Sequence, residues 1–287
     1  MPKSLSKLIN QQKSEVSHFV NARLKIYMFS SEVYIPKDPY EKLDEGFEPI
    51  SKYYSSARPP RDPKDLEVLP DEAKKYIKDK EADILDRSIR RTKSVIKDIA
   101  LCNQFEWFAT FTFKNNRNDI EKCKERMIGW LKRQKKASAS FEYLIVPELH
   151  KDGESLHFHA LIRGYVGEVV KAQNPKTGLE LIKKGREVFD FRNYTLGHSE
   201  VYAIGGTPLD QIKTSFYLMK YVRKDMPIFP NKRRYWSSRT LAKPVIIENP
   251  EEWYLMYFPD KVIEIANGKL LYFENSRIEE HLGGFNG

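Results

Sequence analysis

The fold is decided by the stretch Phe141–Ile162, which reads FEYLIVPELHKDGESLHFHALI. Two apolar runs flank the dipeptide Asp152-Gly153, and Asp-Gly between two such runs is a strong signal for a β-hairpin. A turn at this dipeptide places Glu148 directly opposite His157 on the neighbouring strand. The sequence therefore predicts an antiparallel hairpin whose two strands cover 141–149 and 156–162.

One face of this hairpin carries candidate metal ligands. His157 and His159 stand at positions i and i+2, so both project to one side of the strand while Phe158 points to the other. Glu148 shares the side of the histidines. Two imidazoles and one carboxylate leave open positions on a divalent cation such as Mg²⁺, Mn²⁺ or zinc, as in a catalytic site. The alternative is a pair of half-buried histidines that bond to the backbone.

The opposite face of the hairpin is apolar and should pack under helices. Its members are Tyr143, Ile145, Pro147, Leu149, Leu156, Phe158, Ala160 and Ile162. Periodicity and turn signals predict helices over 71–100, 118–136 and 208–224, and strands over 105–113, 200–204, 262–265 and 270–273. A further strand is possible at 24–29 in an otherwise irregular N-terminal arm, and 164–199 reads as an insertion or second hairpin.

The predicted helix 208–224 carries a second chemical feature. Tyr217 and Tyr221 are four residues apart, so they share one helix face, and Lys220 with Lys224 is expected to form a parallel basic row beside them. Tyrosines at this spacing are often only the edge of an apolar core. Two hydroxyls beside two ammonium groups also suit nucleophilic attack on a phosphodiester.

Composition narrows the class of partner. The 287 residues carry 49 Lys and Arg against 40 Asp and Glu, a net charge of +9, which favours a polyanionic partner. Two cysteines without a Cys-x-x-Cys pair argue against a disulfide framework and a zinc ribbon. There is no phosphate-binding Gly-rich loop, so an energy-driven step would need a partner. No apolar stretch approaches the roughly 20 residues of a membrane span, and no signal-peptide core is evident, so we expect a cytoplasmic protein.

Two basic segments are candidates for nucleic-acid contact. Arg87, Arg90 and Arg91 lie on the helix predicted over 71–100, where a phosphate-contacting face and a plain solvated face are equally reasonable. The second segment mixes cations with aromatic rings that suit stacking on unpaired bases, although simple packing explains the rings as well. Its members are Arg233, Arg234, Tyr235 and Trp236.

Taken together, three motifs resemble those of the HUH-endonuclease replication initiators of rolling-circle plasmids and single-stranded DNA phages. The motifs are Phe108–Phe113, Glu148 with Leu156–Ile162, and Tyr217–Lys224 with its two-tyrosine spacing. They occur in the order of that family and span about residues 100–226.

The resemblance implies an α+β fold with a five-stranded antiparallel sheet, similar to ferredoxin-like and RRM-like folds, flanked by helices. We assign 71–226 to the catalytic domain, 1–70 to an N-terminal arm and 227–287 to a C-terminal extension that could pack on that domain, and the arm and the extension lie outside the resemblance. It also implies the reaction, in which a tyrosine nicks single-stranded origin DNA, leaves a free 3′-hydroxyl and forms a 5′-phosphotyrosyl link that is later resolved. We expect Tyr221 to be the primary nucleophile and Tyr217 a second nucleophile or a stacking residue, with Lys220 and Lys224 compensating the developing charge.

The expected partners are an origin hairpin in single-stranded DNA, Mg²⁺ or Mn²⁺, and a separate helicase from the host or the mobile element. Single-strand transposases and relaxases of the same superfamily share these motifs. Relaxases usually place the nucleophile near the N-terminus, and these transposases are commonly shorter, so both fit less well. A nucleic-acid-binding module without catalysis is the alternative from a different functional class.

Overall fold

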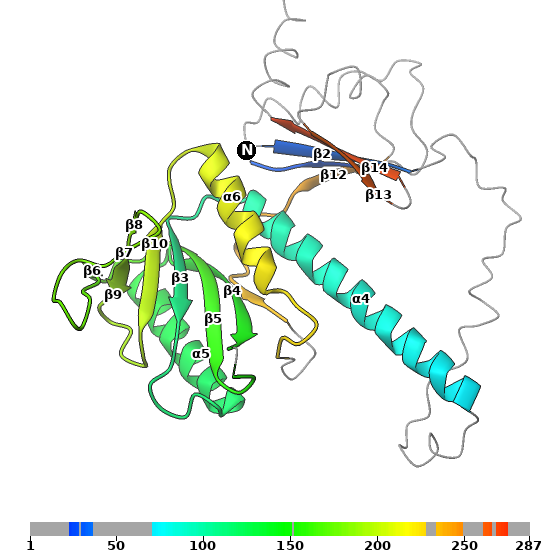
Figure 1. Cartoon of the computed structure of the whole chain (residues 1–287). Helices are drawn as coiled ribbons and strands as arrows, with labels where there is room; N and C mark the ends of the chain where they lie inside the picture. The colour runs from blue at the N-terminus through cyan, green and yellow to red at the C-terminus, as the bar shows by residue number, and fades with distance from the viewer. Residues whose placement is uncertain are drawn as a thin grey trace, which may run out of the picture.

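The computed structural model describes residues 23–28, 30–36, 71–150, 152–227, 234–248, 261–265 and 268–274. Within these ranges the chain forms two larger antiparallel sheets, a small two-stranded hairpin and three α-helices (Figure 1). The α+β class predicted from the sequence is confirmed.

The sheet that carries the histidines has seven strands instead of the expected five. In spatial order these are β11 (Trp236–Ser237), β4 (Glu142–Leu149), β5 (Leu156–Arg163), β3 (Trp107–Phe111), β10 (Ser199–Ala203), β9 (Phe189–Phe191) and β6 (Val169–Lys171). In this sheet β11 from the C-terminal region lies at one edge, and β9 and β6 from the insertion lie at the other.

The hairpin of β4 and β5 has the predicted register. Glu148 pairs with His157, and Val146 pairs with His159. The turn is held by the Asp152 carboxylate, which accepts hydrogen bonds from the backbone N–H groups of Glu154 and Ser155. Gly153 follows with φ of 74°, a left-handed conformation that glycine adopts without strain.

Helices cover both faces of the seven-stranded sheet. On one face lies α5 (Ile120–Ala137), whose buried Met127 and Trp130 pack on the apolar side of the hairpin. That core contains Ile145, Leu156, Phe158, Ala160 and Ile162, with Tyr143 and Leu149 at its margin, so the predicted apolar face is confirmed for these residues. The other face, here called the site face, is covered by α4 (Asp71–Leu101) and α6 (Pro208–Leu218).

The second sheet joins the two ends of the chain. Its spatial order is β12 (Val245–Glu248), β1 (Arg23–Ile26), β2 (Ser30–Pro36), β14 (Gly268–Glu274) and β13 (Lys261–Ile265). The strands expected near 24–29, 262–265 and 270–273 are confirmed. Their pairing was not expected, because the N-terminal arm and the C-terminal extension read as separate regions. The pairing of β2 with β14 joins segments that are far apart in the chain, so no local sequence pattern predicts it.

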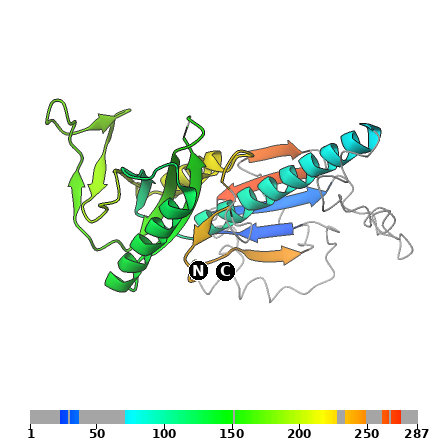
Figure 2. The ribbon, with the colours of Figure 1, turned by 90° about the horizontal axis from the view of Figure 1, so that it is seen from below.

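The second sheet is fixed to α4 by one buried and one partly buried ion pair. The Lys97 ammonium donates to the Glu32 carboxylate, and Lys25 Nζ lies 2.9 Å from an Asp98 carboxylate oxygen. The Tyr27 hydroxyl also donates to Asp98. Figure 2 shows α4 lying along this sheet, and its last turns reach the seven-stranded sheet.

The insertion 164–199 supplies β6 and β9 to the main sheet and forms a small hairpin of β7 (Ile182–Lys183) and β8 (Arg186–Glu187). Among the described helices, none combines the length and apolar character that a membrane span requires.

Candidate active site

The candidate site lies on the site face where α6 ends above β3, β4 and β5. Sheet pairing aligns Glu200, Thr110 and His159 in one row across β10, β3 and β5. Neighbouring residues in such a row project to the same face. The sheet thereby gathers groups that are far apart in the chain.

His159 is the most constrained side chain of the site. It is buried, with its Nε2 atom 2.7 Å from a Glu148 carboxylate oxygen and its Nδ1 atom 3.1 Å from the Thr110 hydroxyl. Burial lowers the pKa of this imidazole, although the Glu148 carboxylate acts in the opposite direction. The ring is thus held at both nitrogens.

His157 is half-buried and stands opposite Glu148 in the hairpin. Its ring centroid lies 4.8 Å from that of His150. Burial lowers the pKa of His157, and the neighbouring His150 and His159 lower it further. Both histidines therefore favour the neutral form, which is the form that binds a metal ion.

The three proposed ligands are brought to one region but are not drawn together around a common point. No group of three or more His, Cys, Asp or Glu side chains is arranged for a metal ion within the described ranges. His159 and Glu148 bond to each other directly, and His157 lies beside His150. The donor types still suit a divalent cation, because two neutral imidazoles and a carboxylate share one face.

The two tyrosines pack onto this site. The ring of Tyr221 stacks on His159, with 3.4 Å between centroids and 11° between planes. Tyr217 meets Tyr221 edge-on at 5.6 Å, and Phe108 from β3 lies 5.3 Å from the Tyr217 ring. The tyrosine pair predicted from the i, i+4 spacing thus shares one face and contacts the histidine hairpin.

The surroundings of the Tyr221 hydroxyl disfavour its ionised form. Its pKa is raised, first by burial, then by the contact with Tyr217 and by the nearby carboxylates of Glu148 and Glu200. Tyr217 is 42% exposed, whereas Tyr221 is half-buried.

Residues 106–226 match the family model described as Replication-associated protein ORF2/G2P. The matched region contains the histidine hairpin and both tyrosines but less than half of the chain. This likeness supports a replication-associated role in which DNA is the partner, and it supports the resemblance to rolling-circle initiators. Comparison with curated proteins and with solved structures found no match.

The predicted basic row beside the tyrosines is wrong in its second member. Helix α6 ends at Leu218, and a single 3₁₀ turn, η1 (Met219–Tyr221), follows it. Val222 is extended, so the helical relation between Lys220 and Lys224 is lost. Lys224 instead pairs with Asp86 of α4 at 2.7 Å, whereas Lys220 remains at the site with its ammonium 4.8 Å from the Tyr217 ring centroid.

The predicted DNA-contacting residues differ in their exposure. Arg87, Arg90 and Arg91 are exposed on α4. Tyr235 and Trp236 are half-buried. Arg234 is buried, and its Nη1 atom has no hydrogen-bond partner among the described residues, so this side chain is not placed for a surface contact with DNA. Arg233 lies outside the described residues.

Glu200 was not singled out from the sequence, and Phe108 and Thr110 were named only as part of the motif Phe108–Phe113, without a role of their own. Phe108 and Thr110 alternate along β3, so strand periodicity could have placed both on the site face. Glu200 could not be found this way, because the pairing of β10 with β3 is not local. Burial raises the pKa of Glu200, but hydrogen bonds from Lys183 and Tyr202 outweigh it and give a net lowered pKa.

Proposed function

We propose that this protein is a rolling-circle replication initiator that nicks single-stranded origin DNA with a tyrosine and later rejoins the ends. The observation that carries the proposal is the contact between Tyr221 and His159, because it joins two motifs about sixty residues apart in the chain. The family likeness over 106–226 supports the same role.

In the proposed step, the Tyr221 oxygen attacks the phosphorus of a phosphodiester. The bond from this oxygen to phosphorus forms while the bond from phosphorus to the 3′-oxygen breaks. The phenol proton leaves to solvent or to a neighbouring carboxylate, and the 3′-oxygen takes up a proton to become the free 3′-hydroxyl. The 5′-phosphate stays covalently attached to the protein.

His157, His159 and Glu148 are the residues that would hold Mg²⁺ or Mn²⁺. A bound divalent ion would withdraw charge from the scissile phosphate. Thr110 and burial hold the His159 ring in one orientation, which is the usual function of the groups that surround a ligating histidine. Glu148 reaches the histidine from the paired strand, so the ligands do not depend on a mobile loop.

Lys220 is the cation best placed to accompany the tyrosines. It is exposed and lies over the Tyr217 ring, where an ammonium group could contact a phosphate of the bound strand. We do not assign this role to Lys224, because its ammonium is paired with Asp86. Tyr217 is proposed as the second nucleophile, or as a residue that stacks against Tyr221.

The proposed partners are single-stranded DNA with an origin hairpin and a separate helicase. The test uses oligonucleotides that tile the non-coding DNA flanking the gene, incubated with the protein and Mn²⁺ and separated in denaturing detergent. We expect one sequence to form a covalent adduct that is lost in EDTA. A label at the 3′ end should move with the protein, whereas a label at the 5′ end should appear in a shorter free strand.

Two other outcomes are informative. Binding without cleavage in any divalent metal would favour a nucleic-acid-binding module without catalysis. Cleavage that leaves the label of the 5′ end on the protein would show attachment to a 3′-phosphate and would contradict the proposed polarity.

A further inference from the structure

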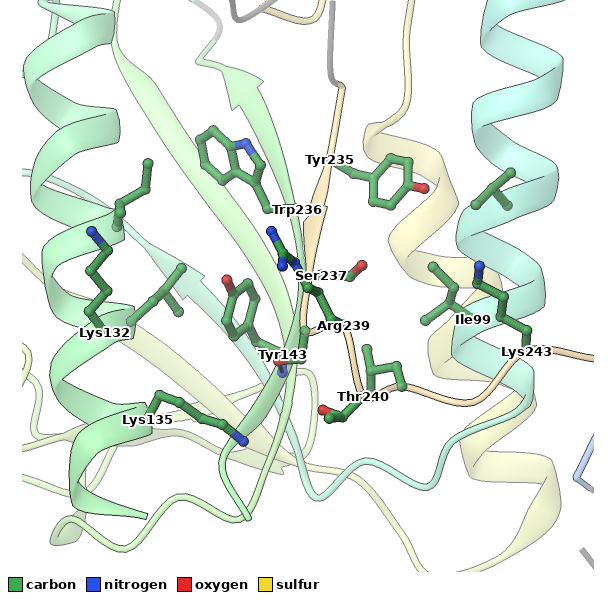
Figure 3. A pocket seen from close by; sticks show the side chains of 15 residues that line it. Ile99, Lys132, Lys135, Tyr143, Tyr235, Trp236, Ser237, Arg239, Thr240 and Lys243 are labelled. Atoms are coloured by element: carbon green, nitrogen blue, oxygen red, sulfur yellow. Dashed lines mark hydrogen bonds between the residues drawn. The ribbon is translucent and has the colours of Figure 1, made fainter. Parts of the chain in front are cut away.

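A second candidate site lies at the edge of the seven-stranded sheet, on the far end of β4 from Glu148. A cavity of about 830 Å³ opens there between α4 and α5 along β11 (Figure 3). We call it the β11 groove. It is lined by Val95, Ile99, Ile128, Leu131, Lys132, Lys135, Tyr143, Tyr235, Trp236, Ser237, Ser238, Arg239, Thr240, Leu241 and Lys243.

The charged side chains of this lining are all cationic. Among the described lining residues there are four cations, three aromatic rings and three serine or threonine hydroxyls, but no carboxylate. Cations interleaved with aromatic rings are what a single-stranded nucleic acid requires, because phosphates contact the cations and bases stack on the rings. An acidic peptide would use the cations alone.

The aromatic rings are held in place by the sheet. Trp236 pairs with Ile145 of β4, so the adjacent Tyr235 and Trp236 point to opposite sides of the edge strand, as Figure 3 shows. Trp236 packs 5.3 Å from Phe158 in the core beneath α5, while Tyr235 packs on the core beneath α4. Little side-chain entropy remains to be lost when a base stacks on either ring.

The backbone of the groove is also fixed. The Ser238 hydroxyl accepts a hydrogen bond from the Tyr143 backbone N–H, and the Thr240 hydroxyl donates to Glu142. Because both bonds tie the segment after β11 to β4, the wall of the groove is formed before any ligand binds.

Three of the four cations are available for a ligand. Lys135 is occupied, because its ammonium donates to the carbonyls of Ala139 and Phe141 at 2.6 and 3.1 Å. Lys132, Arg239 and Lys243 are exposed, and none has an ion-pair partner among the residues that the structure describes. They come from α5 and from the segment after β11, so they surround the rings.

We propose that the β11 groove binds single-stranded nucleic acid, with bases on Tyr235 and Trp236 and phosphates on Lys132, Arg239 and Lys243. Tyr143 and Glu148 are five positions apart on β4, which places the groove about 17 Å from the nicking site. Binding here requires neither a metal nor a tyrosine nucleophile. It thus goes beyond the proposed nicking activity and provides a separate hold on the strand.

The test measures anisotropy of a fluorescein-labelled single strand of mixed sequence, in EDTA, with the Tyr217→Phe/Tyr221→Phe protein so that no adduct forms. The variant Lys132→Gln/Arg239→Gln/Lys243→Gln should bind at least about tenfold more weakly. Its slope of log affinity against log salt should fall by about 2, because each phosphate that a cation neutralises contributes ~0.7 to this slope. The matched control Lys75→Gln/Lys78→Gln/Lys176→Gln removes the same charge from exposed sites elsewhere and should change both values little.

A second readout tests the stacking. The bound strand should quench tryptophan fluorescence, and Trp236→Phe should remove most of this quenching while the affinity changes only slightly. Tyr235→Leu keeps an apolar side chain at the groove and should weaken binding roughly tenfold, within the range for loss of one stacked base. Thermal melts by circular dichroism identify any variant that fails to fold.

Equal losses in the groove variant and the matched control would overturn the proposal, because the effect would then be net charge alone. Full displacement of the strand by a mononucleotide or by polyglutamate would also overturn it, in favour of a small-ligand or acidic-peptide site. Since this assay contains no metal and no nucleophile, a failure of the nicking proposal leaves its result unchanged.

Discussion

The ring of Tyr221 lies flat on the imidazole of His159, with their centroids 3.4 Å apart. The candidate nucleophile and a candidate metal ligand are therefore in van der Waals contact. A substitution at either position must preserve this stacking if its effect on chemistry is to be separated from its effect on packing.

Substitution of the tyrosines identifies the nucleophile. Tyr221→Phe keeps the ring on His159 and removes only the hydroxyl, so we expect at least about a hundredfold loss of covalent adduct. Tyr217→Phe should retain adduct formation. Band intensity in denaturing gels measures both, and the opposite pattern would assign the first attack to Tyr217.

His157→Ala should abolish cleavage while most of the affinity for single-stranded DNA remains. The half-buried ring is a proposed donor for the metal, whereas strand binding is expected to depend on cations elsewhere. Nicking and anisotropy are measured on the same preparation, with His150→Ala as the neighbouring control. If His157→Ala unfolds the protein instead of removing only the cleavage activity, His157 is a core residue with a packing role alone.

Thr110→Val replaces the hydroxyl that contacts His159 Nδ1 by a methyl group of similar size. We expect a 10- to 100-fold loss in affinity for Mn²⁺, because groups that orient a ligating histidine have effects of about this size. Isothermal titration with Mn²⁺ alone measures the change. Thr110→Ser restores a hydroxyl and should recover most of the affinity, whereas equal weakening in both variants would argue against this contact.

The metal-free protein should lose stability as the pH falls below about 6.5. Burial lowers the folded-state pKa of His159 beneath the ordinary value of 6.5, so the unfolded chain binds more protons in the interval between the two values. Stability is unaffected by this group above 6.5 and falls with decreasing pH down to the folded pKa, by at most about 1.4 kcal/mol per pH unit. Urea unfolding in EDTA measures the trend, which His159→Gln should flatten. If the free energy of unfolding depends on pH equally steeply in that variant, groups other than His159 cause the trend.

Glu32→Gln should destabilise the protein by roughly 3 kcal/mol, because it leaves the Lys97 ammonium buried without its carboxylate. Lys97→Met in the same chain should recover much of this loss, since both charges are then absent. A double-mutant cycle in urea measures the coupling between the two positions. Additive effects would indicate that the ion pair does not hold the second sheet to α4.

Much of the site could be predicted from the hairpin alone. The Asp-Gly turn and the alternation of β4 and β5 were sufficient to pair Glu148 with His157 and to send Phe158 to the opposite core. These relations are local, because side chains alternate between the two faces of a strand with a period of two residues. The spacing of Tyr217 and Tyr221 was similarly sufficient to place both rings on one face.

What the sequence did not reveal depends on contacts between distant segments. Lys224 left the expected row because the helix tightens into a 3₁₀ turn before it, and its partner Asp86 belongs to another helix. Glu200 joins the site only through the pairing of β10 with β3. The groove at β11 likewise needs three elements to meet, although its basic and aromatic composition was visible in the sequence.

The pairing of β2 with β14 also has a consequence for biosynthesis. At ordinary translation rates of 5 to 20 residues per second, the first of these strands leaves the ribosome roughly 10 to 50 seconds before its partner is made. During that time the edge of β2 that later meets β14 lacks its neighbour. The second sheet is thus completed only after the strands of the seven-stranded sheet have been synthesised, and until then the edge of β2 lacks the strand that protects it.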